Sequence, residues 1–180
     1  MKSRFENAKK DNKGFSLVEL IIAVVILGII AVVAIGGLYG NVTKSRQNTD
    51  VSNAQSIQSA LSTLSADKDV YKWANDTTGK VTIKWDIAQR YDKSTHKFVK
   101  TASSGANATV GGDTGITLTN DILDKLGDIL TDGLPAAKAG GHFTLTVEGK
   151  GDGNAVITCR AYTSSVSTAD ADTDLVKSAD

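Results

Sequence analysis

Residues 13–43 read KGFSLVELIIAVVILGIIAVVAIGGLYGNVT and form the one long apolar run of the chain. After Glu19 no charged residue follows until Lys44. The 24 residues Leu20–Thr43 are enough, at ~1.5 Å of rise per helical residue, to span the ~30 Å hydrocarbon core of a bilayer. An acidic side chain at the bilayer centre costs roughly 2.5–3.5 kcal/mol and less near a helix end. The pattern therefore predicts a membrane-compatible helix with one carboxylate retained for a purpose.

The residues around Glu19 form a motif: a short basic leader, then Gly14-Phe15-Ser16-Leu17-Val18-Glu19, then the uncharged run. Over residues 9 to about 43 this combination resembles the class III signal of type IV prepilins. In that family a dedicated peptidase cuts after the glycine and methylates the new N-terminal amine, usually on phenylalanine. The resemblance implies cleavage between Gly14 and Phe15 and N-methylation of Phe15.

Two other interpretations of this N-terminus explain less. An ordinary secretory signal has a shorter apolar core, followed by small residues at its cleavage site. A plain transmembrane anchor explains the apolar run but not Gly14, Phe15 and Glu19 together. A membrane-anchored extracellular binding or enzymatic domain is the alternative from another class of protein, and the cleaved N-terminus separates it from a prepilin.

The resemblance implies the major structural subunit of a type IV pilus, a homopolymer assembled through its hydrophobic helix. The implied partners are the prepilin peptidase, the pilus assembly platform, its ATPases, and the membrane before assembly. Such filaments serve adhesion, twitching motility, biofilm formation or DNA uptake, and the sequence does not choose among these. A pseudopilin of a type II secretion or competence system is the closest alternative. The basic leader favours a single-pass precursor in the cytoplasmic membrane, with its head outside, that later reaches the cell surface.

Glu19 and the new amine of Phe15 are the expected assembly residues. They lie one helical turn apart, so a subunit displaced along a filament axis brings its amine to a neighbour's carboxylate. A desolvated pair is not automatically stabilising, but an unpaired buried carboxylate costs several kcal/mol. That asymmetry penalises wrong registers and so specifies assembly. Transient recruitment of a membrane subunit to the growing filament base is the alternative role of Glu19.

The expected organisation has three segments: a cleaved leader at 1–14, a hydrophobic helix at 15–43 and a globular head at 44–180. The leader holds five basic and two acidic residues, so its removal from 20 basic and 20 acidic residues leaves 15 and 18, a net charge of −3. This balance gives no electrostatic reason to expect nucleic-acid binding. The predicted class is α+β, with a long N-terminal helix packed on an antiparallel sheet, as the resemblance to pilins also implies.

Residues 15 to about 64 are expected to form one helix that ends within Ser65–Asp69. Its second half has an apolar stripe at Val51, Ala54, Ile57, Leu61 and Leu64. Polar residues are expected off that stripe, at Asp50, Asn53, Gln55 and Gln58. Three glycines, Gly36, Gly37 and Gly40, fall inside the helix, where each costs ~1 kcal/mol relative to alanine. They suit either close helix packing or a point where the helix unwinds.

Alternation of period two predicts the strands of the head. It is clear at Val81, Ile83, Trp85 and Ile87, and weaker over Phe98–Thr101. Residues 142–162 predict a β-hairpin around a glycine-rich turn at Gly149–Asn154.

The remaining head residues predict one helix and two irregular segments. A short amphipathic helix is expected near residues 120–131, capped by Thr119 or Asn120. Ser103–Gly115, rich in small residues, predicts a loop. The polar, acidic tail Thr163–Asp180 is expected to be partly disordered.

No catalytic or metal-binding pattern stands out, so no enzyme, cofactor or metal is predicted. His96 and His142 are far apart in sequence and expected at the surface or a strand edge. Gly111–Gly115 lacks the lysine of a phosphate loop, and Gly149–Asn154 has too few carboxylates for an EF-hand. Cys159 is the single cysteine, cannot form an intramolecular disulfide, and is expected as a small buried hydrophobe.

Overall fold

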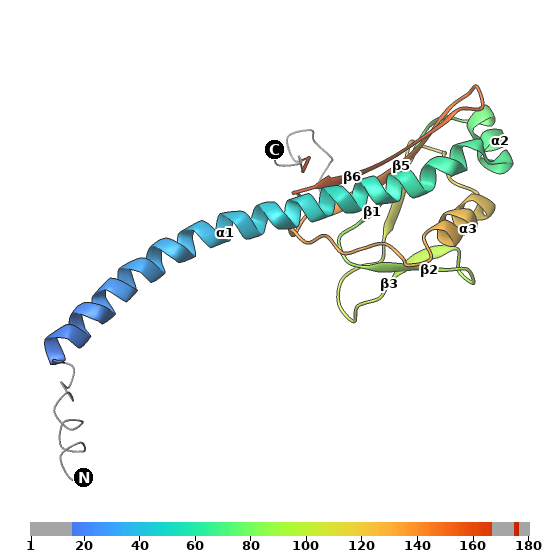
Figure 1. Ribbon diagram of the computed structural model, residues 1–180. Coiled ribbons are helices and arrows are strands. Elements are labelled where there is room, and N and C mark those ends of the chain that lie inside the picture. Colours follow the sequence, from blue (N-terminus) through green and yellow to red (C-terminus); the bar gives the residue numbers. More distant parts are fainter. Residues whose placement is uncertain (1–15, 167–174, 177–180) are drawn as a thin grey trace, which may run out of the picture. The chain divides into compact units, whose positions relative to one another are not determined.

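The computed structural model describes residues 16–166 and 175–176 (Figure 1). Two compact units make up the chain, Met1–Val42 and Thr43–Asp180. Helix α1 (Leu17–Leu61) is followed directly by the 3-10 helix η2 (Ser62–Ala66). The predicted long helix is therefore confirmed. Its predicted first residue, Phe15, lies outside the described residues.

Within the second unit, α1 buries one stripe of side chains in the core of the head. Its apolar members are those predicted from the spacing: Ala54, Ile57 and Leu61, continued by Leu64 of η2. The expectation that Asp50 lies off this stripe is wrong, because Asp50 stands four residues before Ala54 and is only 2% exposed. Its two carboxylate oxygens accept hydrogen bonds from the backbone N–H groups of Lys138 and Ala139, both at 2.8 Å.

A second helix, α2 (Lys68–Asp76), was not predicted. The polar stretch that ends α1 also starts α2, because the Asp67 side chain accepts a hydrogen bond from the Asp69 N–H and caps the new helix. The Lys125 ammonium bonds to both Asp67 and Asp69. Helix α2 then buries Val70, Trp73 and Ala74.

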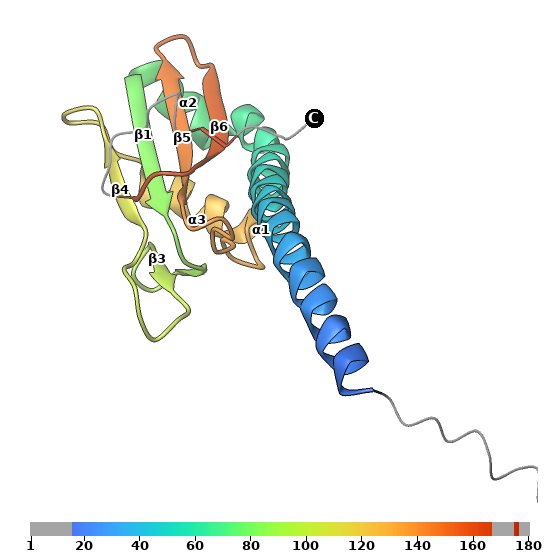
Figure 2. The same ribbon diagram turned by 90° about the vertical axis from the view of Figure 1, so that its left-hand side faces the viewer.

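The main sheet has four antiparallel strands in the order β4-β1-β5-β6 (Figure 2). They are β1 (Thr78–Trp85), β4 (Thr109–Gly112), β5 (His142–Lys150) and β6 (Ala155–Tyr162). The predicted hairpin is confirmed, although Gly149 still pairs with Ala155, so the turn is shorter than expected. Predicted strand residue Ile87 lies beyond the end of β1.

The inner face of the sheet forms the core of the head together with α1, α2 and α3. Buried residues of β1 alternate as predicted, at Val81, Ile83 and Trp85. In β5, Phe143, Leu145 and Val147 lie in the core, and Thr144 is also buried. The rings of Trp85 and Phe143 stack with centroids 5.3 Å apart. Cys159 of β6 also lies in this core, 4% exposed, which confirms the expected buried hydrophobe; burial raises the pKa of its thiol to about 12.

Two short strands, β2 (Gln89–Asp92) and β3 (Lys97–Lys100), form a separate ribbon. Strand β3 confirms the weaker prediction, whereas β2 was missed. The prediction of a loop over Ser103–Gly115 is wrong for β4, which pairs with a strand far away in sequence and therefore has no local signal. Buried Gln89 fixes this region, since its side chain donates to the Ile87 and Ala106 carbonyls.

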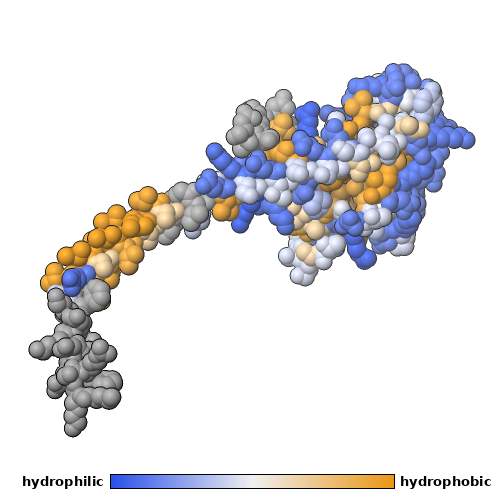
Figure 3. Space-filling model, viewed as in Figure 1, coloured by the Kyte–Doolittle hydropathy of each residue, from blue (hydrophilic) through white to orange (hydrophobic). Residues whose placement is uncertain are grey.

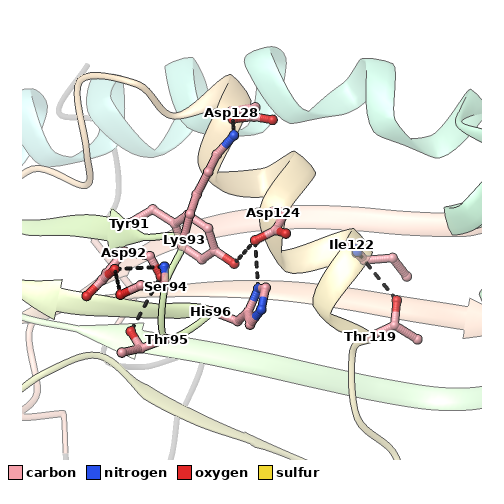
Figure 4. A network of polar contacts seen from close by, with 10 residues as sticks. All are labelled: Tyr91, Asp92, Lys93, Ser94, Thr95, His96, Thr119, Ile122, Asp124 and Asp128. Carbon is pink, nitrogen blue, oxygen red and sulfur yellow. Dashed lines mark hydrogen bonds and ion pairs between the residues drawn. The ribbon is translucent and has the colours of Figure 1, made fainter.

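Helix α3 (Asn120–Ile129) confirms the predicted helix, with Thr119 as its cap. A polar network joins α3 to the ribbon (Figure 4). The Tyr91 hydroxyl donates to Asp124 Oδ1 at 2.6 Å, and His96 Nδ1 lies 2.9 Å from the same oxygen. Hydrogen bonds from Tyr91 and His96 hold the pKa of Asp124 below its ordinary value, and burial, followed by the Asp124 bond, raises the pKa of Tyr91.

The tail after β6 is described only for residues 163–166 and 175–176. Leu175 pairs with Tyr162, the Val176 N–H donates to the Ala161 carbonyl at 2.9 Å, and Val176 is buried. Packing and backbone hydrogen bonds thus hold this part of the C-terminal region. The expected disorder of the tail falls largely on residues outside the described ones.

Candidate assembly site on the N-terminal helix

Helix α1 begins with a reciprocal cap built from Ser16 and Glu19. The Ser16 N–H donates to Glu19 Oε2 at 2.9 Å, and the Val18 N–H donates to Ser16 Oγ at 3.3 Å. The first helical bond, from Leu20 N–H to the Ser16 carbonyl, follows at 3.1 Å. This is the capping-box arrangement, which satisfies backbone donors that the helix itself leaves unbonded.

The sequence reasoning assigned Glu19 and missed Ser16. The signal was nevertheless present, because a serine followed three residues later by glutamate, ahead of an apolar run, is the sequence pattern of a capping box. Among the described residues, only Ser16 donates a hydrogen bond to the Glu19 carboxylate, and it occupies Oε2. No described residue donates to the other oxygen, Oε1.

The apolar side chains that follow Glu19 are exposed on every side of the helix. The large ones between Leu17 and Val33 are 51% to 73% exposed, and Figure 3 shows them as one continuous hydrophobic surface. By length and composition, this stretch is able to cross a membrane. A helix that is hydrophobic all round needs lipid or other helices to cover it, because water hydrates such a surface at a high free-energy cost.

The other predicted site residues divide into two groups. Gly14 and Phe15 lie outside the described residues. Gly36, Gly37 and Gly40 lie within α1, whose helical backbone continues through all three in this single chain.

The head offers little for catalysis among its described residues. His96 is half-buried on the ribbon and bonded to Asp124. His142 is fully buried, so the expected surface or strand-edge position is wrong for it; its ring stacks on Tyr162 and its Nδ1 lies 2.7 Å from the Ser164 carbonyl. The described residues contain no cluster of three His, Cys, Asp or Glu side chains suited to a metal ion.

The family model of the prokaryotic N-terminal methylation motif matches residues 9–35. No curated protein and no solved structure matches the chain. The N-terminal segment is thus a type IV pilin-like class III signal peptide, and the long helix followed by a four-stranded antiparallel sheet matches the pilin fold.

The methylation motif supports a type IV pilin-like or pseudopilin precursor, of the kind that the prepilin peptidase processes. The exposed apolar helix suits membrane anchoring of that precursor. The motif and the fold together suggest a structural protein rather than an enzyme.

Proposed function

We propose that this protein is the major structural subunit of a type IV pilus. The observation that carries the proposal is the apolar stretch of α1, which is exposed on every side, lies largely within the matched methylation motif, and has Glu19 in its first turn. After cleavage between Gly14 and Phe15 and N-methylation of Phe15, the apolar parts of α1 pack together as the filament core. The heads, whose core is closed without outside help, face outward.

Subunit register depends on Glu19 and the amine of Phe15. Among residues 16–166, the Glu19 carboxylate has one donor, the Ser16 N–H. A neighbour displaced along the filament axis adds the charged amine of its Phe15 at the other oxygen. Leaving that carboxylate without a charged partner in an apolar filament core costs several kcal/mol, so only the register that forms the pair is stable.

The filament also needs a helix that adapts to its neighbours. Gly36, Gly37 and Gly40 are the weakest part of α1, at ~1 kcal/mol each relative to alanine. We place the unwinding segment there: helical in the single membrane subunit and open in the filament, where neighbouring chains or water satisfy the freed backbone groups.

These properties imply a path for the protein from the membrane to the filament. The precursor inserts once into the cytoplasmic membrane with its head outside, is processed by the prepilin peptidase, and is added to the filament by the assembly platform and its ATPases. The surface filament then serves adhesion, twitching motility or biofilm formation. No nucleic acid, cofactor or metal enters this proposal.

Processing tests the proposal most directly. Mass spectrometry of sheared surface filaments should show a subunit that begins at methylated Phe15. Gly14→Trp should leave uncleaved precursor in the membrane and abolish filaments, because the peptidase site should have little room for a side chain there. Gly14→Ala, the matched control, should be processed more slowly but still yield filaments.

The outcomes separate the alternatives. Filaments whose subunits retain Lys13 would contradict the proposal. Cleaved protein that never forms long filaments in shear fractions would indicate a pseudopilin. Uncleaved protein in the wild type would indicate a membrane-anchored domain of another class.

A further inference from the structure

The outward face of α1 on the head carries no charge. Between Gln47 and Ala66 the only ionisable residue is Asp50, which is buried. The residues turned away from the core are exposed and short or amidic: Ser52, Gln55, Ser56, Ser59 and Thr63. Exposed faces of globular helices are normally charged, whereas depletion of charge marks the centre of an interface.

A second surface, whose own residues carry no charge, lies along Thr101–Gly112, where every residue except Ala108 is exposed. The ammonium of the neighbouring Lys100 donates to the Gly105 carbonyl of this surface at 2.9 Å. It ends in β4, an edge strand of the main sheet. The Asp113 N–H donates to the Lys80 carbonyl at 3.0 Å, so Lys80 and Asp113 form a hydrogen-bonded pair next to the ladder between β1 and β4. Because bonded pairs alternate in an antiparallel ladder, the backbone N–H and C=O groups of Val110 and Gly112 point away from β1, and no described residue bonds to them.

These two surfaces lie at opposite edges of the sheet. Strand β4 forms one edge and β6 the other (Figure 2). Helix α1 runs along β6, where Gln58 Oε1 accepts a hydrogen bond from the Cys159 N–H at 3.1 Å and covers that edge. One copy therefore presents an uncharged helix face on one side and, on the other, the uncharged strand β4, whose outer edge no described residue pairs with.

We propose that the outward face of α1 on one subunit packs against the Thr101–Gly112 surface of a second copy of this chain. The hydroxyl and amide groups of the helix supply donors and acceptors for the unbonded edge of β4. The charged groups nearest the contact are Lys100, bonded to the Gly105 carbonyl, Asp113 at the end of β4, and Lys84, the cross-strand neighbour of Thr109. Unpaired edges are commonly protected by charge or proline, and β4 has neither.

A contact between two different surfaces on opposite sides of the subunit does not close on itself. Repetition of such a heterologous contact generates an open helical array, as a filament requires. The inference thus rests on the proposed function and deepens it, by naming the surfaces through which heads meet once the apolar helices have brought the copies together.

Charge exchange tests the contact in the full-length protein in cells. Ser59→Lys and Val110→Glu should each lower the yield of sheared filaments by about tenfold, since each buries an unpaired charge. Combining the two should restore the yield to within about twofold of wild type, because the charges then face each other. Thr131→Lys is the matched control at an exposed site outside both surfaces and should keep the wild-type yield.

Cross-linking gives a reading that does not depend on yield. A chain with Ser59→Cys and Val110→Cys should form a ladder of disulfide-linked multimers within filaments. The native Cys159 is buried and stays silent. Thr131→Cys with Val110→Cys should give no ladder.

Two failures are distinguishable. If the wild type forms filaments and Ser59→Lys gives the same yield, this inference is wrong and the proposed function is intact. The same holds if the double-cysteine chain forms normal filaments without a ladder. A wild-type protein that forms no filaments overturns the proposed function, and this inference with it.

Discussion

The N-terminal part of α1 and the head solve the burial of apolar surface in opposite ways. From Leu17 to Val33 every large apolar side chain is exposed, whereas the head buries its own in one continuous core. At ~25 cal/mol per Å² of apolar surface removed from water, the first arrangement gains its stability only from lipid or other copies. The head therefore has a core of its own, whereas the N-terminal helix is a surface that lipid or other helices must cover.

The two acidic residues that represent these regions on α1 show the same difference. Glu19 is exposed and receives one hydrogen bond, from the Ser16 N–H of its own helix. Asp50 is buried and receives two, from Lys138 and Ala139 of a distant loop. Each Asp50 oxygen thus has a donor within the chain, whereas for Glu19 the described residues supply a donor to one oxygen only.

Glu19→Val should have the largest effect, and it should affect the N-terminal part of α1 rather than the head. Membrane insertion should be kept or improved, because a costly carboxylate disappears. Filament yield should fall by more than about tenfold, since the pairing that fixes the register is lost. Quantitative immunoblots of membrane and sheared fractions measure both.

The matched control for Glu19→Val is Val18→Ala, which alters an adjacent exposed side chain and leaves the carboxylate. It should yield filaments close to wild type. Normal filaments from Glu19→Val would show that the carboxylate has no role in register.

Asp50→Ala should have the next largest effect, and it should appear in the head alone. It leaves the N–H groups of Lys138 and Ala139, which are part-buried, without their acceptor, at up to about 1–3 kcal/mol each. Chemical denaturation of a soluble fragment beginning at Thr43 should show a loss of about 2–5 kcal/mol. Asp132→Ala, at an exposed position, should change the free energy of unfolding by less than about 0.5 kcal/mol. Equal stabilities of the two variants would mean that Asp50 is not a structural residue.

Elements whose structure depends on a local sequence pattern could be predicted from the sequence alone. Val81, Ile83 and Trp85 alternate because one face of β1 is buried, and the β5–β6 hairpin has its own glycine-rich turn. The stripe at Ala54, Ile57 and Leu61 identifies the buried side of α1 for the same reason.

Structure that depends on distant partners escaped prediction. Strand β4 consists of Thr-Val-Gly-Gly and exists only by pairing with β1. Strand β2 is polar, and its Tyr91 ring packs in a notch left by Gly127 of α3, where any side chain would collide with it. Asp50 resembles a surface residue until the loop at Lys138 reaches it.

The candidate site follows the same division. Glu19 and the surrounding motif are readable from spacing, and the family model of the methylation motif covers them. The hydrogen bond between Ser16 and Glu19 follows a known local pattern and was overlooked, although it was predictable. The two surfaces of the proposed head contact could be identified only once the sheet order was known, since no sequence pattern places β4 and β6 at opposite edges.

Acidification should have a smaller effect, confined to the head. Hydrogen bonds from Lys125 hold the pKa of Asp67 below its ordinary value of 3.8, and bonds from Tyr91 and His96 do the same for Asp124. A carboxyl whose folded pKa is lowered adds stability above its unfolded pKa and loses it as the pH falls through the folded pKa. Thermal unfolding of the Thr43 fragment should therefore show a melting temperature that declines below about pH 4.

Lys125→Met tests this assignment. The variant should be less stable than wild type at pH 7, because Asp67 and Asp69 lose their partner. The difference should shrink as the pH falls through the acidic range, since protonated carboxyls no longer gain from the ammonium. A difference that stays constant from pH 7 to pH 2 would contradict the assigned role of the pair.

Substitution of the glycine pair should give the smallest effect, and it tests whether the N-terminal part of α1 unwinds in a filament. Gly36→Ala/Gly37→Ala removes a propensity penalty of ~2 kcal/mol and favours continuous helix. The single subunit is already helical here, so its membrane insertion should not change. In the filament, the variant should resist the local unwinding that we propose for Gly36 to Gly40, and so assemble poorly or stretch less under a pulling force.

Gly28→Ala, in the same apolar run and with open space around it, should stretch like wild type. A filament map with unbroken helix through Gly40, or equal extensibility of the two variants, would leave close helix packing as the role of these glycines.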